Sequence, residues 1–389
     1  MFSNRMICAL LVPVVLEQLL NSIMGTADTM MVSNVGSAAI SAVSLVDSIN
    51  ILVIQAFSAL AAGGAIVCAQ YIGQQNHKKA NESARQVLFI ITAISVAVSL
   101  LCLVFQRPLL RLIFGSVEVE VMRNSRIYFF FTALSFPFIA AYDAAASIFR
   151  AQDNTRGPML ISMISNVMNI VGNAIMIWGF HLGVEGAALS TLVSRIFCAV
   201  VVLLQLRRDR QPIVVRDYYK IRPDWRMIRR ILGLGIPSGV ENSMFQLGKI
   251  LVLSLVSTFG TSAIAANAVA NAVALFQILP GIAINLAITS VIARCIGAGK
   301  HDQAQYYTKK LIGITYASMI LMNVLIYLAL PFILHAYHLS PETYESARKI
   351  LLLHGSCCIL IWPISFSLPS TLRAAGDAKV TMWISIVSM

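Results

Sequence analysis

Long apolar segments without charge constrain this chain more than any other feature of its sequence. The segment VLFIITAISVAVSLLCLVF, from Val87 to Phe105, contains no charged residue. A run of about 18 or more apolar residues is long enough to cross the hydrocarbon core of a bilayer as a helix. Such runs recur along the chain, and only 12% of its residues are charged, against about 25% in soluble domains. We therefore predict an all-α polytopic membrane protein.

The apolar segments predict ten membrane-spanning helices. Their expected ranges are 6–32, 40–71, 86–106, 127–149, 159–180, 186–206, 232–257, 263–293, 310–333 and 349–372. An eleventh begins near Val380 and stops at Met389, so we expect the last one to two helices to be missing from this sequence. The first span is not a signal peptide, because it is too long and contains acidic residues.

The net charge of +12 is distributed unevenly between the two sides of the predicted membrane. With the N-terminus in the cytoplasm, the cytoplasmic segments hold 21 lysines and arginines and the outer segments hold six. This asymmetry fits the positive-inside rule. We expect a plasma or inner membrane protein with a cytoplasmic N-terminus. Because topology accounts for the basic charge, we expect no nucleic-acid partner.

The sequence repeats itself at a shift of 224 positions. Pro13 and Glu17 correspond to Pro237 and Glu241. Three further segments match in the same order: VGSAAISAV with FGTSAIAAN, IGQQNHKKA with IGAGKHDQA, and, at a shift of 223, SIFRA with STLRA. The first copy holds six spans, so both copies enter the membrane from the same side. A direct repeat of this kind has a pseudo-twofold axis along the membrane normal.

The repeat predicts the domain organisation. Residues 1–206 form an N-terminal six-helix lobe, residues 207–230 a basic cytoplasmic linker, and residues 231–389 a C-terminal lobe. Two lobes related in this way are typical of alternating-access carriers, whose substrate site lies at the interface near mid-membrane. We therefore expect a central cleft between the lobes.

Polar residues on the first span mark a candidate site. Positions 17, 21 and 28 share one helical face, so Glu17, Asn21 and Asp28 form a polar stripe on an apolar helix. A carboxylate in hydrocarbon costs about 3 kcal/mol on insertion scales, so such residues are functional by default. Glu17 and Glu241 are candidates for attracting a cationic substrate or carrying a proton.

Other roles for the acids inside the spans stay open. Glu17 and Glu241 could instead be neutral acids hydrogen-bonded between helices, or form structural ion pairs with Arg195 or Lys249. For Asp47 a solvated or capping role is favoured, and the role of Asp143 is undecided.

Two prolines predict movable elements near these acids. Pro13 and Pro237 each precede their glutamate by four residues. A proline inside a helix removes one backbone hydrogen bond and bends the helix. We expect kinks at both positions.

Five segments in order resemble the multidrug and toxic compound extrusion (MATE) family of secondary transporters. These segments are GTADTMMVSNVG, AQYIGQQNHKKA, SIFRAQDNTRGPM, GVEGAALST and GIPSGVENSMFQLGK. The resemblance runs from about residue 5 to the end of the chain. It implies twelve helices in two lobes around a cleft, and export of organic, often cationic compounds in exchange for Na⁺ or H⁺.

The resemblance also implies a cation-coupling site in the N-terminal lobe. The family's first-helix acid matches Asp28, and its asparagine and threonine match Asn169 and Thr191. The family's aspartate position holds Asn173, a departure that removes one negative charge. A hard cation binds better as carboxylates are added to its oxygen ligands, so this departure weakens the case for Na⁺ as a metal at Asp28.

The resulting hypothesis is a secondary active antiporter that exports organic cations in exchange for H⁺ or Na⁺. We expect a monomer with no cofactor, whose partners are small-molecule substrates and membrane lipid. The alternative is a flippase for lipid-linked precursors, which would need several basic residues in the cleft, whereas only Arg195 and Lys249 lie inside the predicted spans. An integral-membrane enzyme would need clustered acids at a membrane face, and the sequence has none, so we predict no enzymatic activity.

Overall fold

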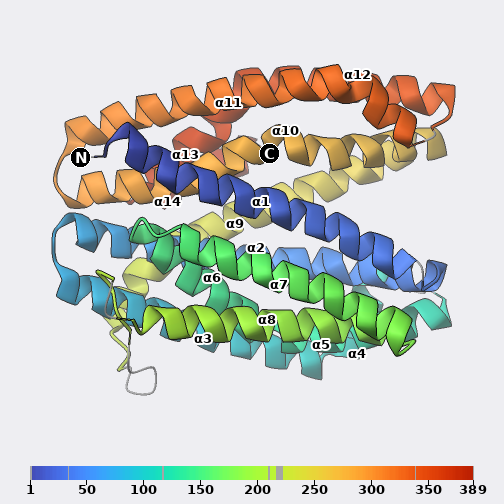
Figure 1. The fold of residues 1–389 in the computed structure, drawn as a ribbon, viewed down its shortest axis with the longest axis horizontal. Helices are drawn as coiled ribbons and strands as arrows, with labels where there is room; N and C mark the ends of the chain where they lie inside the picture. The colour runs from blue at the N-terminus through green and yellow to red at the C-terminus, as the bar shows by residue number, and fades with distance from the viewer. Residues whose placement is uncertain are drawn as a thin grey trace.

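The structure is a computed structural model that describes residues 2–33, 35–115, 118–208, 211–215, 222–337 and 339–388. Within these ranges the description leaves out the side chains of residues 24–30, 33, 37, 114, 254, 257, 261 and 336. Nearly all of the described chain is helical (Figure 1).

The helices fall into two sets along the chain. The first set, called the N-lobe, contains α1 (Asn4–Ser33), α2 (Ser37–Gly73), α3 (His77–Val104), α4 (Gln106–Phe114), α5 (Val119–Leu134), α6 (Phe136–Ala151), α7 (Arg156–Ala174), η1 (Ile175–Gly179) and α8 (Val184–Leu206). The second set, called the C-lobe, contains α9 (Trp225–Ser257), α10 (Thr261–Gly297), α11 (His301–Ala336), α12 (Pro341–Trp362), η3 (Pro363–Ser367), α13 (Leu368–Ala375) and α14 (Ala378–Ser388).

Most of the predicted spans are helices of membrane-spanning length. Among the described residues, eight helices are long and apolar enough to cross a membrane, and the bent pair α5–α6 makes a ninth. The predicted span at 232–257 is helix α9, which is not among these nine. α9 already begins at Trp225, inside the predicted linker 207–230, because Asp224 caps it by accepting hydrogen bonds from two backbone N–H groups.

Two predicted spans differ from the helices that the structure contains. The apolar segment 86–106 is part of α3, which starts earlier, at His77, and gives way to the short helix α4 after Phe105. The segment 127–149 is bent by 43° between α5 and α6. Pro137 at the start of α6 cannot continue the backbone hydrogen bonds of α5, and Arg195 donates to the Ser135 hydroxyl at 2.7 Å, which holds the break.

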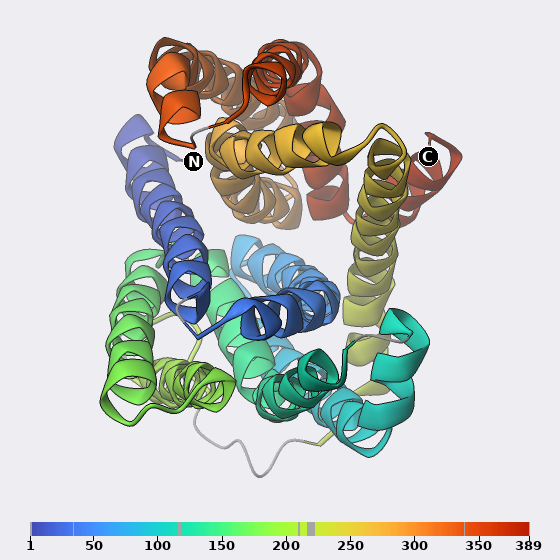
Figure 2. The ribbon, with the colours of Figure 1, turned by 90° about the vertical axis from the view of Figure 1, so that its right-hand side faces the viewer.

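The first helix of each lobe packs against the other lobe. Helix α1 contacts α7 of its own lobe and α10 of the C-lobe, whereas α9 contacts α14 of its own lobe and α2 of the N-lobe. Figure 2 shows α1 and α9 on opposite sides of the molecule, each running between the two groups of helices. The repeat relates α1 to α9, α2 to α10 and α7 to α14, so this exchange of contacts occurs twice and supports the predicted direct repeat.

The repeat also extends to the backbone of the turns. Gln75 and Gly299, which are 224 positions apart, both adopt positive φ, at 57° and 69°. Asp153 and Gly376, at a shift of 223, do so as well, at 63° and 109°. Both pairs lie at the end of the bundle that carries the N-terminus. We call this end, with its turns at 74–76, 152–155, 298–300 and 376–377, the basic end.

Helices α2 and α10 cross in close backbone contact at the basic end. A side chain on Gly73 would place its Cβ 2.2 Å from the carbonyl oxygen of Arg294, and one on Gly297 would lie 2.0 Å from that of Gln70. Small residues allow helices to approach closely in membranes. Because Gly73 and Gly297 are repeat equivalents, each lobe contributes one glycine to this crossing.

We predict that Gly297→Ala lowers the stability of the protein. The new methyl group would meet backbone rather than a yielding side chain, and overpacking of this kind costs about 1–3 kcal/mol. The matched control is Gly313→Ala in α11, whose Cβ would meet nothing within 4 Å. The measurement is the thermal unfolding midpoint in detergent. Equal midpoints for the two variants would contradict the close crossing.

Candidate functional site

Glu17 is a buried acid at the junction of three N-lobe helices. Its side chain, on α1, is only 4% exposed. The hydroxyl of Tyr142, on α6, lies 3.3 Å from Glu17 Oε1 and 3.1 Å from the carbonyl oxygen of Pro158, on α7. The guanidinium of Arg150 attracts the Glu17 carboxylate electrostatically. Glu17 forms no ion pair with any described residue, and the cation that attracts its carboxylate is Arg150 rather than Arg195 or Lys249, the two partners that the sequence had left open.

The polar stripe on α1 continues towards α7. The Oδ1 atom of Asn21 accepts hydrogen bonds from the Ser162 hydroxyl at 3.0 Å and from the Asn166 amide at 2.9 Å. The backbone of Asp28 belongs to the last third of α1, but its side chain lies outside the described residues. The coupling role of Asp28 therefore stays a prediction.

The three other predicted coupling residues lie together between α7 and α8. The Asn173 amide is 3.4 Å from Asn169 Oδ1, and the Asn169 amide is 3.3 Å from the Thr191 hydroxyl. That hydroxyl donates to the carbonyl oxygen of Ala187 at 3.0 Å, so it accepts from Asn169. Asn169 and Asn173 are 6% and 1% exposed. The cluster supplies neutral oxygen and nitrogen atoms and no formal charge.

Asp143, whose role the sequence left undecided, belongs to the buried region around Glu17. The hydroxyl of Ser58, on α2, donates to Asp143 Oδ2 at 2.5 Å. Asp143 also interacts electrostatically with Glu17 and Arg150. Its position directly after Tyr142 in an apolar helix was the available signal, because one turn of α6 can then face both α1 and α2. Asp47 accepts a hydrogen bond from Asn50 at 3.1 Å.

In the C-lobe, Glu241 forms an ion pair with Arg373. The distance from Glu241 Oε2 to Arg373 Nη1 is 3.3 Å, and the two side chains are 16% and 19% exposed. Arg373 comes directly after the predicted span 349–372 and lies in α13, where it also donates to the Ser370 hydroxyl one turn earlier. Glu241 can therefore attract a cationic substrate only in a state in which Arg373 has moved away.

The two lobes use the same charged motif. Arg150 donates to the hydroxyl of Ser147 at 3.1 Å, and Arg373 donates to the hydroxyl of Ser370 at 3.0 Å. Each serine precedes its arginine by three residues, in the repeat-related segments SIFRA and STLRA. Each lobe thus sets an arginine at the end of its fourth span against the glutamate of its first helix.

A second charged group of the C-lobe, Lys249, has no acidic partner among the residues that the structure describes. Lys249 Nζ, on α9, lies 5.0 Å from the ring centroid of Phe245 and interacts electrostatically with His354 on α12. Nδ1 of His354 is 2.7 Å from Gln277 Oε1. Within the described part of the chain, Lys249 forms no ion pair. The C-lobe interior is therefore more basic than the N-lobe interior.

The two prolines lie inside continuous helices. Pro13 is within α1 and Pro237 is within α9. Each removes one backbone hydrogen bond without ending its helix, so each leaves a point of low bending stiffness. The predicted kinks at these positions stay predictions.

The lobes are joined at the basic end by a second pair of repeat-related contacts. The Gln70 amide donates to the carbonyl oxygen of Ala374 at 3.1 Å. Arg294, the repeat equivalent of Gln70, donates to the carbonyl oxygen of Ala151 at 3.0 and 2.6 Å and forms an ion pair with Asp153. Equivalent residues of the two repeat copies therefore hold the two lobes together at this end.

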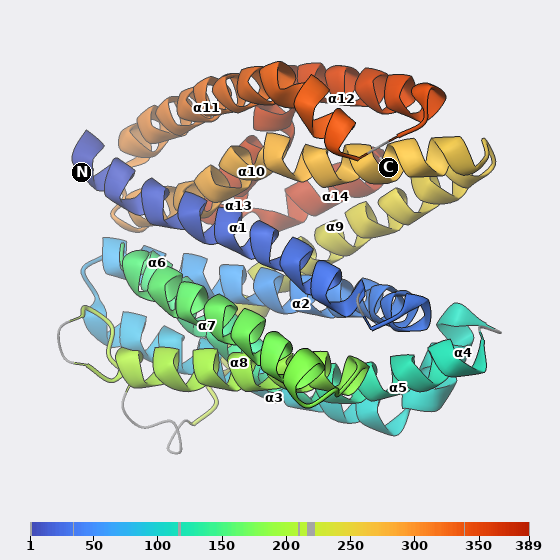
Figure 3. The ribbon, with the colours of Figure 1, turned by 45° about the vertical axis from the view of Figure 1, so that its right-hand side comes forward.

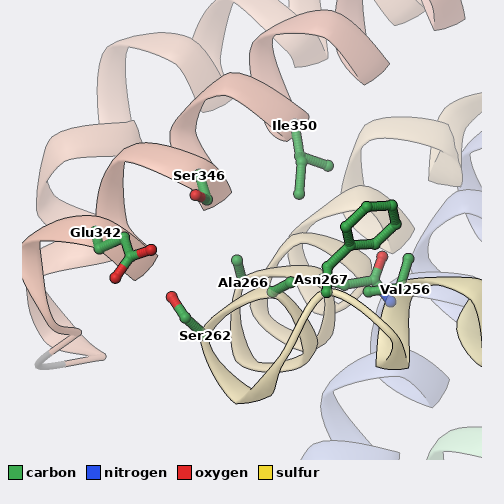
Figure 4. A pocket seen from close by; sticks show the side chains of 9 residues that line it. Val256, Ser262, Ala266, Asn267, Glu342, Ser346 and Ile350 are labelled. Carbon is green, nitrogen blue, oxygen red and sulfur yellow. The ribbon is translucent and has the colours of Figure 1, made fainter.

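A pocket of about 380 Å³ lies at the opposite end of the bundle, within the C-lobe (Figure 4). Its walls come from the end of α9, the start of α10 and the start of α12, and include Asn267, Glu342 and Ser346. None of the predicted site residues lines this pocket. Among the described residues, no group of three or more His, Cys, Asp or Glu side chains could hold a metal ion.

The fold and the buried charges define an all-helical membrane protein of two repeated halves, the architecture of an alternating-access carrier. The MatE family model matches residues 13–175 and 237–389, two copies whose starts are 224 positions apart. The chain belongs to this family, whose members are transporters rather than enzymes. The predicted family and the predicted repeat are confirmed.

Individual proteins resemble the chain along most of its length. It is 26% identical to the uncharacterized transporter YisQ of Bacillus subtilis, with 97% of this chain and 83% of that protein covered. It is also 26% identical to the probable multidrug resistance protein YoeA of the same organism, covering 99% and 83%. A structure of the outward-facing conformation of a multidrug resistance MATE family transporter has a TM-score of 0.91 at 19% identity, covering 98% and 84%, which confirms the fold.

We predict that Glu241 and Arg373 are energetically coupled. Arg373→Gln leaves a largely buried carboxylate without a counter-charge, which costs about 3 kcal/mol of unfolding free energy. The double variant Glu241→Gln/Arg373→Gln removes that penalty, so its loss of stability is smaller than the sum of the single losses by about 1 kcal/mol or more. Thermal unfolding in detergent measures both effects.

The matched control for this cycle is the exposed pair Arg348–Glu345. Its atoms are 3.6 Å apart, and its side chains are 52% and 47% exposed. Solvent screens such a pair, so its coupling is close to zero. Additive losses at Glu241 and Arg373, no larger than those of the control, would show that the buried pair does not stabilise the fold.

Proposed function

We propose that this chain is a secondary active antiporter that exports organic cations in exchange for H⁺ or Na⁺. The observation that carries the proposal is the line of polar groups on the face of α1 that packs on α7, from the buried Glu17 to the more exposed Asn21, which accepts hydrogen bonds from Ser162 and Asn166. The multidrug resistance role named for related proteins supports the same substrate class. Ionisable groups in hydrocarbon are costly and mark ion or substrate pathways in transporters.

In this proposal, Asp28 carries the coupling ion. Asn169, Asn173 and Thr191 form an uncharged cluster, so Asp28 is the carboxylate that the resemblance assigns to the same site. With asparagine at position 173, the site has one negative charge fewer than the family pattern. A hard metal cation loses more from this change than a proton, which needs only one carboxylate, so the cluster favours H⁺.

The contacts at the basic end indicate which state of the transport cycle the structure represents. Gln70–Ala374 and Arg294–Ala151 tie the lobes together there, and α2 and α10 touch through their backbones. If the basic end faces the cytoplasm, as the positive-inside rule predicts, this state is closed to the cytoplasm. Export then requires these contacts to break and re-form once in each cycle. A single chain contains both lobes, so we propose that it works as a monomer in the plasma or inner membrane.

The second candidate function, flipping of a lipid-linked precursor, gains support from three basic residues. Arg150 and Arg373 lie within helices beside buried glutamates, and Lys249 has no acidic partner among the described residues. These residues give the interior more positive charge than the sequence indicates. A substrate with a diphosphate would be held by such groups.

We predict that Asp28→Asn abolishes coupled transport. An amide cannot exchange a proton, so uptake of a cationic dye into proteoliposomes under a pH gradient falls by at least about tenfold. The control Asp302→Asn makes the same change at an exposed position on α11 and leaves uptake unchanged. Parallel vesicles carry a Na⁺ gradient instead of the pH gradient.

Each outcome of this experiment decides between named alternatives. Wild-type uptake driven only by Na⁺ would mean that the amide cluster and Asp28 still bind a metal ion. Uptake that survives in Asp28→Asn would contradict the coupling role of Asp28. Movement of a lipid-linked diphosphate probe, without movement of the dye under either gradient, would favour the flippase.

A further inference from the structure

A groove of about 650 Å³ lies between α9 and α14 at the basic end. Helix α14 packs beside α9 (Figure 3). The groove is lined by Trp225, Ile228, Arg229, Leu232, Gly233, Ile236, Pro237 and Lys379. None of these residues contributes to the buried polar groups described above, although Pro237 is one of the two helix prolines.

The charged lining residues lie near one end of the groove, and the apolar residues continue along it. Trp225 and Arg229 lie in the first two turns of α9, and Lys379 lies in the first turn of α14. The other lining residues of α9 are apolar and continue from Ile228 to Pro237. The atoms that line the groove are apolar, and Arg229 and Lys379 border it with Trp225 near the starts of α9 and α14, from which an apolar run leads towards the middle of the bundle.

The length of the groove matches one leaflet of a bilayer. From Trp225 to Pro237 the helix rises by roughly 18 Å, at about 1.5 Å per residue. Half of the hydrocarbon core is about 15 Å thick. Trp225 is 72% exposed, and tryptophan is enriched at the level of the lipid headgroups. The apolar run then lies at the depth of an acyl chain.

Within the described part of the chain, no acidic side chain neutralises the basic residues of the groove. Neither Arg229 nor Lys379 forms an ion pair with any described residue. The two acids nearest to them in the sequence, Asp224 and Asp377, instead accept hydrogen bonds from backbone N–H groups at the starts of α9 and α14. Two positive charges therefore remain for an anionic ligand at the mouth of an apolar groove.

We propose that this groove binds one anionic phospholipid of the leaflet at the basic end. The phosphate lies between Arg229 and Lys379, and one acyl chain follows Ile228, Leu232 and Ile236. Basic pockets between membrane helices on the cytoplasmic side recognise lipid headgroups by the same combination of charge and apolar surface. Because the groove ends at Pro237, a bound chain packs against the point where α9 bends most easily.

Gly233 allows the groove to be filled without disturbing the fold. A Cβ atom at this position would meet nothing within 4 Å, so a larger side chain projects into open space. Gly233→Leu therefore occupies the site of the acyl chain while it improves the helix propensity of α9.

The repeat supplies a charge-matched control in the N-lobe. Arg5 on α1 and Arg156 on α7 are the equivalents of Arg229 and Lys379. Arg5→Gln/Arg156→Gln removes two positive charges near the same end of the bundle and leaves the groove intact. A loss caused only by weaker surface attraction to anionic lipid would be equal in the two double variants.

The test is native mass spectrometry of the purified protein in detergent, titrated with phosphatidylglycerol or phosphatidylcholine. We expect one phosphatidylglycerol to bind with at least about tenfold preference over phosphatidylcholine. We expect Arg229→Gln/Lys379→Gln to weaken this binding about thirtyfold, since two basic residues close to an anionic headgroup are removed. Gly233→Leu abolishes it with an unchanged unfolding midpoint, and Arg5→Gln/Arg156→Gln leaves it within about threefold of wild type.

Four results would overturn the proposal. These are equal affinity for the two lipids, binding that survives in Gly233→Leu, equal losses in the two charge variants, and displacement of the lipid by millimolar inorganic phosphate. Dimers that form at the expense of lipid binding would assign the groove to a second copy of the chain instead.

Discussion

The close crossing of α2 and α10 at the basic end is the constraint on which the rest of the structure depends. Gly73 and Gly297 let the two backbones touch, and Gln70 and Arg294 then reach carbonyl oxygens of the opposite lobe. The two lobes are equivalent at this crossing, because each donates a side-chain hydrogen bond to a backbone carbonyl oxygen of the other. A contact of this form can separate and re-form without rebuilding either lobe, as alternating access requires.

The cost of charge in hydrocarbon explains why the interior motifs occur twice. Glu17 and Glu241 each lie near an arginine that the repeat places at the end of the fourth span, and a serine one turn earlier orients each arginine. An unpaired carboxylate would be expensive in this environment. The repeating unit therefore supplies each glutamate with an arginine, and the lobes differ in other polar side chains, such as the Asn169–Asn173–Thr191 cluster in the N-lobe and Lys249 with His354 in the C-lobe.

Apolar length and self-similarity were enough to predict the fold class and most of the spans from the sequence, because both are properties of continuous segments, whereas the family was predicted from the resemblance of five short segments. The sequence could not predict features that depend on where a helix stops. Arg150 and Arg373 each fall one residue beyond a predicted span, whereas both belong to helices, α6 and α13, and interact with the glutamates. The break at Ser135 depends on a hydrogen bond from Arg195, which is distant in the sequence. For Asp28, whose side chain is outside the described residues, the prediction still rests on resemblance.

The most direct test of the central claim is a pair of interspin distances measured by electron paramagnetic resonance in nanodiscs. Labels at the exposed positions Lys78 and Asp302 report on the basic end, and labels at Glu118 and Glu342 report on the opposite end, in a background without the exposed Cys8 and Cys357. The account predicts a short and a long population at the basic end, whose ratio shifts with pH while the opposite end shifts in the reverse sense. A single unchanging distance at both ends, or lengthening at both ends together, would contradict it.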